Sequence, residues 1–389
     1  MRREIPYVLT AVLAACVIAA PAAADTLLVA NKSEATLSLV DVDSGEVVAT
    51  VPTGAGPHEV AVSPDGKTAV VADYGQREPG SSLTVVDVAG AKVLRTIGLG
   101  EYRRPHGIVF VGDDRLLATV ESNRAVIEVD VARGKVVRAI ETGQEVSHMV
   151  AVPASGKRAY VANIGSGSVT VLDLATGKKL GDVATGAGAE GVAVTPDGSQ
   201  VWVTNREADT VTLVDPESLE VVATLESPSF PIRAEATPDG RWVLVTNARS
   251  GDLAVIDTKS RQIARRVPLT LGKETDTRGR LFGDRFGDSS VPIGIEVAPS
   301  GKRAFIAHAN ADAVQVLDLE SWETVAVLEP GKEPDGMAYS TVDVRRASIT
   351  TLPKFSEYDA RTSALAPTSH QVNCSPMIQP IITATTGLT

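Results

Sequence analysis

Three of the five histidines in this 389-residue chain recur at one position of a repeated segment. His58, His106 and His148 occupy this position in three successive copies, and the next copy has Glu190 there. Three neutral imidazoles and one carboxylate suit zinc or copper, so these four residues form a candidate metal site. The structural alternative is a set of polar side chains that bind only water.

Other polar residues near this position suit anions. Asp335 has the same place in the last copy, and His308 ends a strand that should point to the same face. Arginines lie in the expected loops of that face, and guanidinium groups suit carboxylate or phosphate ligands. The alternative for these arginines is surface pairing with the nearby glutamates Glu78, Glu101, Glu121 and Glu207. The candidate ligand-binding residues are His58, His106, His148, Glu190, Asp335, Arg104, Arg233, Arg280, Arg285 and His308.

These residues belong to a repeat of four short β-branched runs separated by Gly, Pro, Asn and Asp, clearest in residues 158–198. Such runs predict a four-stranded antiparallel sheet, and blade-sized periods of about 40–45 residues are typical of a β-propeller. The spacings between copies are 46, 43, 43, 42, 42 and 61 residues. They are measured between the aspartates that end the second run: Asp41, Asp87, Asp130, Asp173, Asp215, Asp257 and Asp318.

The two ends of the array predict how the ring closes. The chain enters at residues 27–31 with no preceding innermost strand, and residues 335–340 supply one innermost strand with no partners after it. Pairing residues 335–340 with residues 27–52 would complete a seventh sheet and remove the exposed edges. We therefore predict an all-β, seven-bladed propeller over residues 25–340.

Irregular loops are confined to one predicted face, which we call the top. Residues 76–82 and 98–105 are lengthened, and residues 270–290 are inserted before an innermost strand. Insertions on one face of a repeat array usually mark the binding face. The long insertion could cover the channel mouth as a lid; the alternative is a solvated surface loop.

The repeated residues resemble a known family. Tyr160-Val161-Ala162-Asn163, Val203-Thr204-Asn205 and Val245-Thr246-Asn247 look like the YVTN β-propeller repeat, and the resemblance covers residues 27–340. Members include periplasmic proteins similar to YncE and propellers associated with quinoprotein alcohol oxidation. The resemblance implies the fold and, by analogy, a place beside such a periplasmic quinoprotein system.

Composition and the chain ends set the expected location. The net charge of −11 argues against a general nucleic-acid binder. Residues 1–24 have the basic start, apolar run and small-residue site of a signal peptide, which predicts a periplasmic or secreted protein with no transmembrane segment. The alternative is a lipoprotein anchored at Cys16. Residues 341–389, rich in Ser, Thr and Pro, are predicted to be a disordered tail.

These observations favour an exported, non-catalytic binding or scaffold protein. Its top face would hold a small anionic ligand, a divalent metal such as zinc or copper, or a protein partner. An enzyme is the first alternative, since propeller lactonases act from the channel mouth; Glu190, Asp335 and the three histidines would then hold a metal or serve as a general base. A structural cell-surface module is the second.

Overall fold

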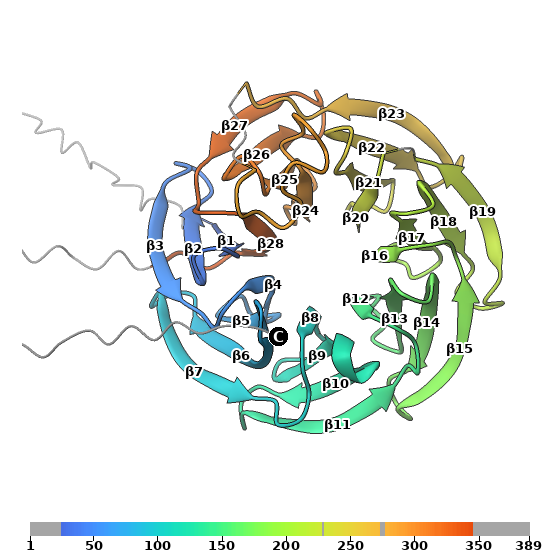
Figure 1. Cartoon of the computed structure of the whole chain (residues 1–389), viewed down its shortest axis with the longest axis horizontal. Coiled ribbons are helices and arrows are strands. Elements are labelled where there is room, and N and C mark those ends of the chain that lie inside the picture. The colour runs from blue at the N-terminus through green and yellow to red at the C-terminus, as the bar shows by residue number, and fades with distance from the viewer. Residues whose placement is uncertain (1–24, 228, 273–276, 345–389) are drawn as a thin grey trace, which may run out of the picture. The chain divides into compact units, whose positions relative to one another are not determined.

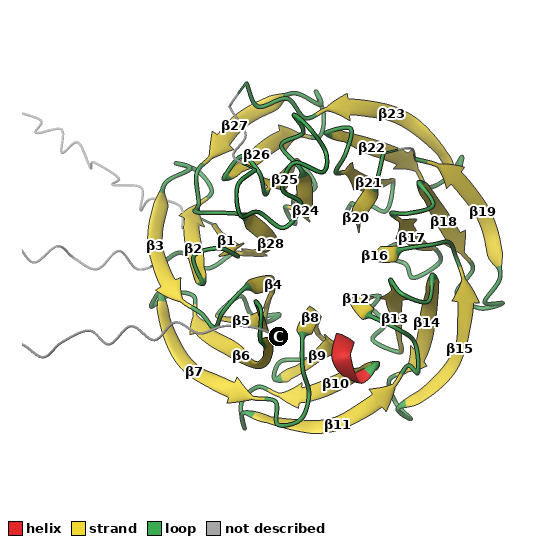
Figure 2. Cartoon of the chain, viewed as in Figure 1, coloured by secondary structure: helices red, strands yellow, loops and turns green. Residues whose placement is uncertain are grey.

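The computed structural model describes residues 25–227, 229–272 and 277–344. These form seven four-stranded antiparallel sheets around a central channel (Figure 1), so the predicted seven-bladed propeller is confirmed. Within the described part of the chain, helix is limited to one 3-10 turn, η1 (Glu121–Asn123) (Figure 2). No helix in these residues is long and apolar enough to cross a membrane. The predicted signal peptide, and the predicted tail from residue 345 onward, lie outside the described residues.

Each blade has the same strand order from the channel outward. The innermost strands are β28 (Pro334–Ser340), β4 (Pro57–Val62), β8 (Pro105–Phe110), β12 (Ser147–Ala151), β16 (Ala189–Val194), β20 (Pro231–Ala236) and β24 (Pro292–Val297). The second strands are β1 (Thr26–Asn31), β5 (Thr68–Gly75), β9 (Arg115–Val120), β13 (Arg158–Asn163), β17 (Val201–Asn205), β21 (Trp242–Asn247) and β25 (Arg303–His308). The third strands are β2 (Thr36–Asp41), β6 (Pro79–Asp87), β10 (Ala125–Asp130), β14 (Ser168–Asp173), β18 (Thr210–Val214), β22 (Asp252–Asp257) and β26 (Ala313–Asp318). The outermost strands are β3 (Val47–Pro52), β7 (Lys92–Gly98), β11 (Lys135–Glu141), β15 (Lys178–Ala184), β19 (Val221–Glu226), β23 (Gln262–Pro268) and β27 (Thr324–Leu328).

The ring closes as the sequence predicts. Strand β28 pairs antiparallel with β1, with Thr26 opposite Ser340 and Leu28 opposite Ala338. Beyond β28, residues 341–344 continue along this closure, because Thr26 Oγ1 donates a hydrogen bond to the Val342 carbonyl at 2.7 Å and Val344 is buried. The first and last strands of the propeller therefore belong to one sheet.

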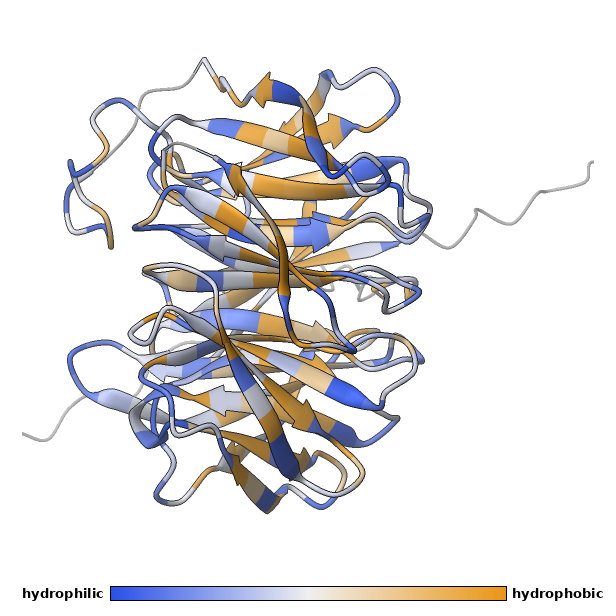
Figure 3. Ribbon diagram, turned by 90° about the vertical axis from the view of Figure 1, so that its right-hand side faces the viewer, coloured by the Kyte–Doolittle hydropathy of each residue, from blue (hydrophilic) through white to orange (hydrophobic). Residues whose placement is uncertain are grey.

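The core lies between neighbouring blades. Hydrophobic residues concentrate along the strands, whereas the connecting loops are mostly polar (Figure 3). Leu27 and Val29 of the first blade pack with Phe305 of the last, and Val70 packs with Leu116 across another pair of blades. A single sheet thus buries both faces only because it has a neighbour on each side.

The recurring Asn and Thr have structural roles. The buried Asn163 amide donates to Thr170 Oγ1 at 2.9 Å, and Asn205 repeats this bond to Thr212, so each ties the second strand to the third. The threonine before the asparagine joins blades instead, as Thr204 Oγ1 donates to the Ile232 carbonyl of the next blade at 3.1 Å. These motif residues therefore account for the fold rather than for a function.

Candidate functional site

One repeated turn positions the site. The residue before every innermost strand has a positive φ, a conformation that non-glycine residues adopt only at a cost. The seven are Gly56, Arg104, Val146, Gly188, Phe230, Val291 and Glu333, with φ between 55° and 74°. Each turn brings the second residue of its strand to the upper channel, so these residues line a common cavity: His58, His106, His148, Glu190, Ile232, Ile293 and Asp335. The predicted ring of rim residues thus converges as expected from the repeat.

The cavity at the top of the channel has a volume of about 270 Å³. Its remaining walls come from a second repeat position, from the turn before β12, from β20 and from the long insertion. These further lining residues are Tyr74, Glu121, Ile164, Arg206, Val146, Arg233, Leu281 and Phe282. One side is polar, and the other is largely apolar.

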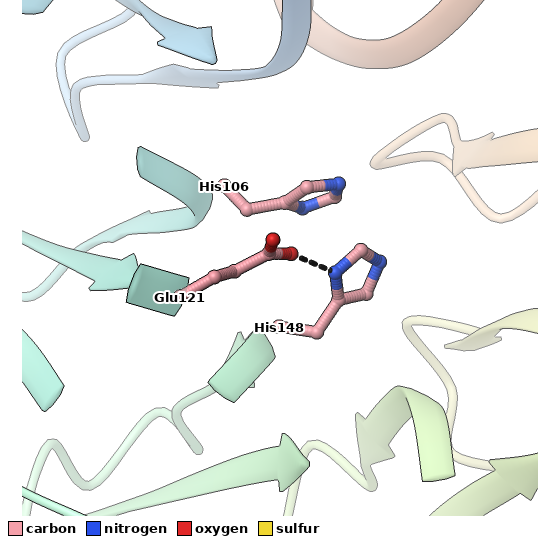
Figure 4. Close-up of side chains that lie close together, drawn as sticks. All are labelled: His106, Glu121 and His148. Carbon is pink, nitrogen blue, oxygen red and sulfur yellow. Dashed lines mark hydrogen bonds and ion pairs between the residues drawn. The ribbon is translucent and has the colours of Figure 1, made fainter. Parts of the chain in front are cut away.

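The polar wall is built by β5, β8, η1 and β12. Glu121 Oε1 lies 2.5 Å from His148 Nδ1 (Figure 4), and Tyr74 donates its hydroxyl to Glu121 Oε2 at 2.7 Å. The His106 and His148 rings are 3.6 Å apart between centroids, and the His58 ring lies 5.0 Å from that of His106. Three histidines from successive blades therefore do come together. Besides the predicted Glu190, a second carboxylate, Glu121, lies next to them.

Charges on this wall follow from burial and pairing. Burial alone would lower the pKa of His148, but its bonds to Glu121 and Glu190 outweigh burial and raise it above the ordinary value. Burial lowers the pKa of His58 to about 3 and that of His106 well below its usual range, so both are neutral. Burial would raise the pKa of Glu190, but His148 and the two arginines beside it lower it to about 2.

Arg233 lies at the centre of the channel. Its guanidinium contacts Glu190 Oε1 at 3.1 Å and Glu59 Oε1 at 2.8 Å, carboxylates from different blades. Asp335 is 4.0 Å away and pairs with Lys32 at 2.8 Å. Arg233 lines both the upper cavity and a second one below it, so the guanidinium and its partners separate the two.

The structure places two of the predicted site residues apart from the cavity. His308 is buried inside its own blade, with Nδ1 2.8 Å from Ser290 Oγ and Nε2 3.0 Å from Gln315 Oε1. It therefore takes the structural place that asparagine has in other blades. Arg285 stacks on Phe230 and Phe286, with its guanidinium 5.0 and 5.3 Å from the ring centroids.

Arg104 and Arg280, also predicted as site residues, do not line the cavity but contact elements that do. Arg104 lies 4.6 Å from the centroid of the Tyr74 ring. Arg280 pairs with Asp312 at 2.7 Å, which holds the insertion against the loop between β25 and β26. Leu281 N is also bound to Glu333 Oε1 at 2.7 Å. Residues 277–290 of the insertion thus contribute Leu281 and Phe282 to the cavity wall.

Sequence reasoning missed the second lining position. One residue at the end of the second strand faces the upper channel in four blades: Tyr74 within β5, and Glu121, Ile164 and Arg206 directly after β9, β13 and β17. In most blades this residue follows the recurrent asparagine, so the asparagine could have located this position in the sequence. Glu121 follows Val120 instead, so the template fails in that blade.

The lower cavity, of about 360 Å³, contains three carboxyl groups: Glu59, Glu235 and Glu296. Burial raises the pKa of Glu235 to about 8. Burial, and then the nearby charge of Glu235, raise the pKa of Glu296 well above its usual range. Both accept a backbone hydrogen bond at 3.1 Å, Glu235 from Val297 N and Glu296 from Tyr339 N. At neutral pH these two groups therefore tend to keep their protons.

Glu235→Gln should stabilise the protein relative to wild type, and this gain should grow as pH rises. In the unfolded chain this carboxyl ionises near pH 4.5, whereas in the folded protein its pKa is about 8. The folded state therefore binds more protons between these values, and its stability falls as pH rises through this window. The amide keeps the acceptor for Val297 N, so we expect a gain that is about 3–4 kcal/mol larger at pH 8 than at pH 5.

Urea unfolding of wild type and variant at pH 5 and pH 8 measures this difference. Glu217→Gln, at an exposed carboxylate, is the matched control and should leave the pH profile unchanged. An equal effect of Glu235→Gln at both pH values would contradict the assignment.

The fold and the site together define a seven-bladed β-propeller with a cavity at one end of its channel, polar on one side and apolar on the other. Residues 7–116 and 113–281 match the model of the YncE-like β-propeller family, and the chain belongs to this family. No protein with a curated description matches the sequence.

Two solved structures are similar in fold. One is hydrazine synthase of Kuenenia stuttgartiensis, with a TM-score of 0.59 and 21% identity over 72% of this chain and 88% of that chain. The other is a functionally unknown protein of Desulfotomaculum acetoxidans DSM 771, with a TM-score of 0.68 and 15% identity over 82% of this chain and all of that one. At these identities the likeness is one of fold.

Proposed function

We propose that this protein is a non-catalytic binding protein that holds a small organic carboxylate in the upper cavity of its channel. One observation carries the proposal: the Nε atoms of Arg206 and Arg233 are buried and have no hydrogen-bond partner among the described residues. Both arginines line the cavity. A buried donor without an acceptor is costly, so an acceptor supplied by a ligand would stabilise the site.

The opposite wall indicates the rest of the ligand. Ile232, Ile293, Leu281 and Phe282 give an apolar surface that faces the polar groups across about 270 Å³. Cavities of this kind bury an apolar body while a few polar groups fix its orientation. A short-chain or aromatic carboxylate has the matching shape, with an anionic end for the arginines and an apolar end for the apolar wall.

Pairing among the titratable groups favours binding over catalysis. Glu190 is bound by Arg206 at 2.6 Å and by Arg233 at 3.1 Å, and a low pKa makes it a weak base. We also propose that the protein acts in the periplasm or after secretion. That part rests on residues 1–24 alone.

Calorimetric titration of the metal-stripped protein with benzoate, and with benzamide as the uncharged match, tests the proposal. We expect benzoate to bind, and benzamide and the Arg206→Met variant to lose at least about tenfold in affinity. Arg249→Met is the matched control, because Arg249 also lies over Phe230, at 5.7 Å compared with 5.4 Å for Arg206, but does not line the cavity.

Equal affinity for benzoate and benzamide, or no binding of either, would contradict the proposed ligand class. Hydrolysis of a lactone panel by the same sample would overturn the non-catalytic assignment in favour of a lactonase.

A further inference from the structure

We propose that the polar wall of the upper cavity is a binding site for one divalent transition-metal ion, with His106, Glu121 and His148 as its ligands. One donor atom from each of the three lies within 4.8 Å of the others, and all three residues are buried. Two atoms bound to one ion at about 2.0–2.2 Å lie at most about 4.4 Å apart, so small side-chain movements suffice. This inference rests on the proposed function in placing the ion at the wall of the same cavity.

Each ligand is supported as a metal ligand usually is. His148 Nδ1 faces Glu121 Oε1 at 2.5 Å, and its other nitrogen, Nε2, lies 3.4 Å from Glu190 Oε1. A carboxylate behind the second nitrogen of a ligating histidine fixes the ring and strengthens it as a donor. Tyr74 holds the other Glu121 oxygen at 2.7 Å. An ion between Glu121 and His148 would take the place of the proton in their hydrogen bond.

His106 supplies an observation independent of that pair. Its Nδ1 is buried and has no hydrogen-bond partner among the described residues. The ring lies between those of His58 and His148, and no hydrogen bond to a described residue accounts for its orientation. Figure 4 shows the His106 ring beside Glu121 and His148. A metal ion bound to these residues would satisfy a nitrogen of this imidazole.

The geometry gives Glu190 a different role from the one that the repeat suggested. Its two oxygens are bound by Arg206 at 2.6 Å and by Arg233 at 3.1 Å, which leaves it behind His148 rather than at the ion. Two imidazoles and one carboxylate suit zinc or copper(II) and leave a coordination position open toward the cavity.

The test uses the full chain, stripped with chelator and dialysed against Zn²⁺, with bound metal measured by mass spectrometry and affinity by competition with a fluorescent chelator. We expect one ion per chain. Glu121→Gln and His106→Gln should each lower the affinity by at least about 100-fold, and Glu190→Gln by about tenfold, in line with losses at supporting residues. Glu145→Gln, at an exposed neighbouring glutamate, is the control and should bind as wild type does.

Thermal unfolding shows whether each variant is folded, and the visible spectrum of the Co²⁺ form reports the ligand set in those that are. No zinc on the stripped wild type, or full affinity in folded Glu121→Gln, would overturn the site. Because no organic ligand is present, zinc binding without benzoate binding would contradict the proposed function alone, and the reverse would contradict the metal site alone.

Discussion

Replacing Arg233 with methionine is expected to lower the free energy of unfolding by about 3–5 kcal/mol at pH 7. The Arg233 side chain is only 6% exposed, and its guanidinium contacts Glu59 at 2.8 Å and Glu190 at 3.1 Å. Its removal leaves Glu59 and Glu190 buried without the cation that they share. Urea unfolding followed by fluorescence of the buried Trp202 measures the change.

The loss of Arg233 should affect the two carboxylates differently, because Glu190 has other charged partners. Glu190 keeps Arg206 and His148, whereas no other ion pair of Glu59 occurs among the described residues. Burial already raises the pKa of Glu59, and the charge of Arg233 opposes that shift. Without Arg233 this pKa should rise further, so the loss of stability should grow as pH increases.

A double variant separates charge from packing. Arg233→Met with Glu59→Gln should recover part of the lost stability, because the double variant no longer buries the unpaired Glu59 carboxylate, while the methionine fills similar space. Arg206→Met is the comparison, because Arg206 shares Glu190 but is 22% exposed at the cavity edge and should cost only about 1 kcal/mol. A loss below that of Arg206→Met, or no recovery in the double variant, would contradict the central role given to Arg233.

The fold could be predicted from the sequence because its signals are local and repeated. The turn aspartates, such as Asp173 accepting a bond from Thr176 N at 2.7 Å, recur once per blade and fix the repeat length. The rim residues could be aligned for the same reason, since each is the second residue of an innermost strand. Convergence around an axis then follows from ring closure alone.

Contacts across the channel could not be predicted in this way. Arg233 and Glu59 occupy a strand position that is glycine in four blades: Gly107, Gly191, Gly294 and Gly336. A Cβ at Gly294 would lie 2.0 Å from the Asp335 carbonyl of the next strand, which explains the glycines. Nothing along the chain tells which side chain meets which from opposite blades.

Two single residues show the limit within a repeat. His308 ends a strand as predicted but turns into its blade, because it replaces an asparagine whose amide bridges two strands. Glu121 looked like a surface partner for neighbouring arginines, yet the η1 turn brings it to His148. Equivalent positions in sequence therefore share a place on the backbone but not a side-chain environment.

Ending the chain before Pro334 is expected to abolish cooperative folding, the largest effect that we predict. Strand β28 is the innermost strand of the blade that joins both ends of the ring. Its loss would expose one edge of β1 and remove the buried Met337 and Ala338 from the contacts between blades. It would also take Asp335 away from Lys32, whose side chain is 8% exposed.

Together the lost packing and strand hydrogen bonds should exceed about 5 kcal/mol, comparable with the whole stability of many domains. The matched control ends after Arg346 and keeps every described residue, so it should melt as the full chain does. Calorimetry and gel filtration compare the two. A chain ending at Glu333 that melts cooperatively within a few degrees of the control would show that the ring does not depend on this closure. Recovery of the cooperative transition by an added peptide of residues 334–344 would show that the lost strand itself, rather than chain length, is what the ring requires.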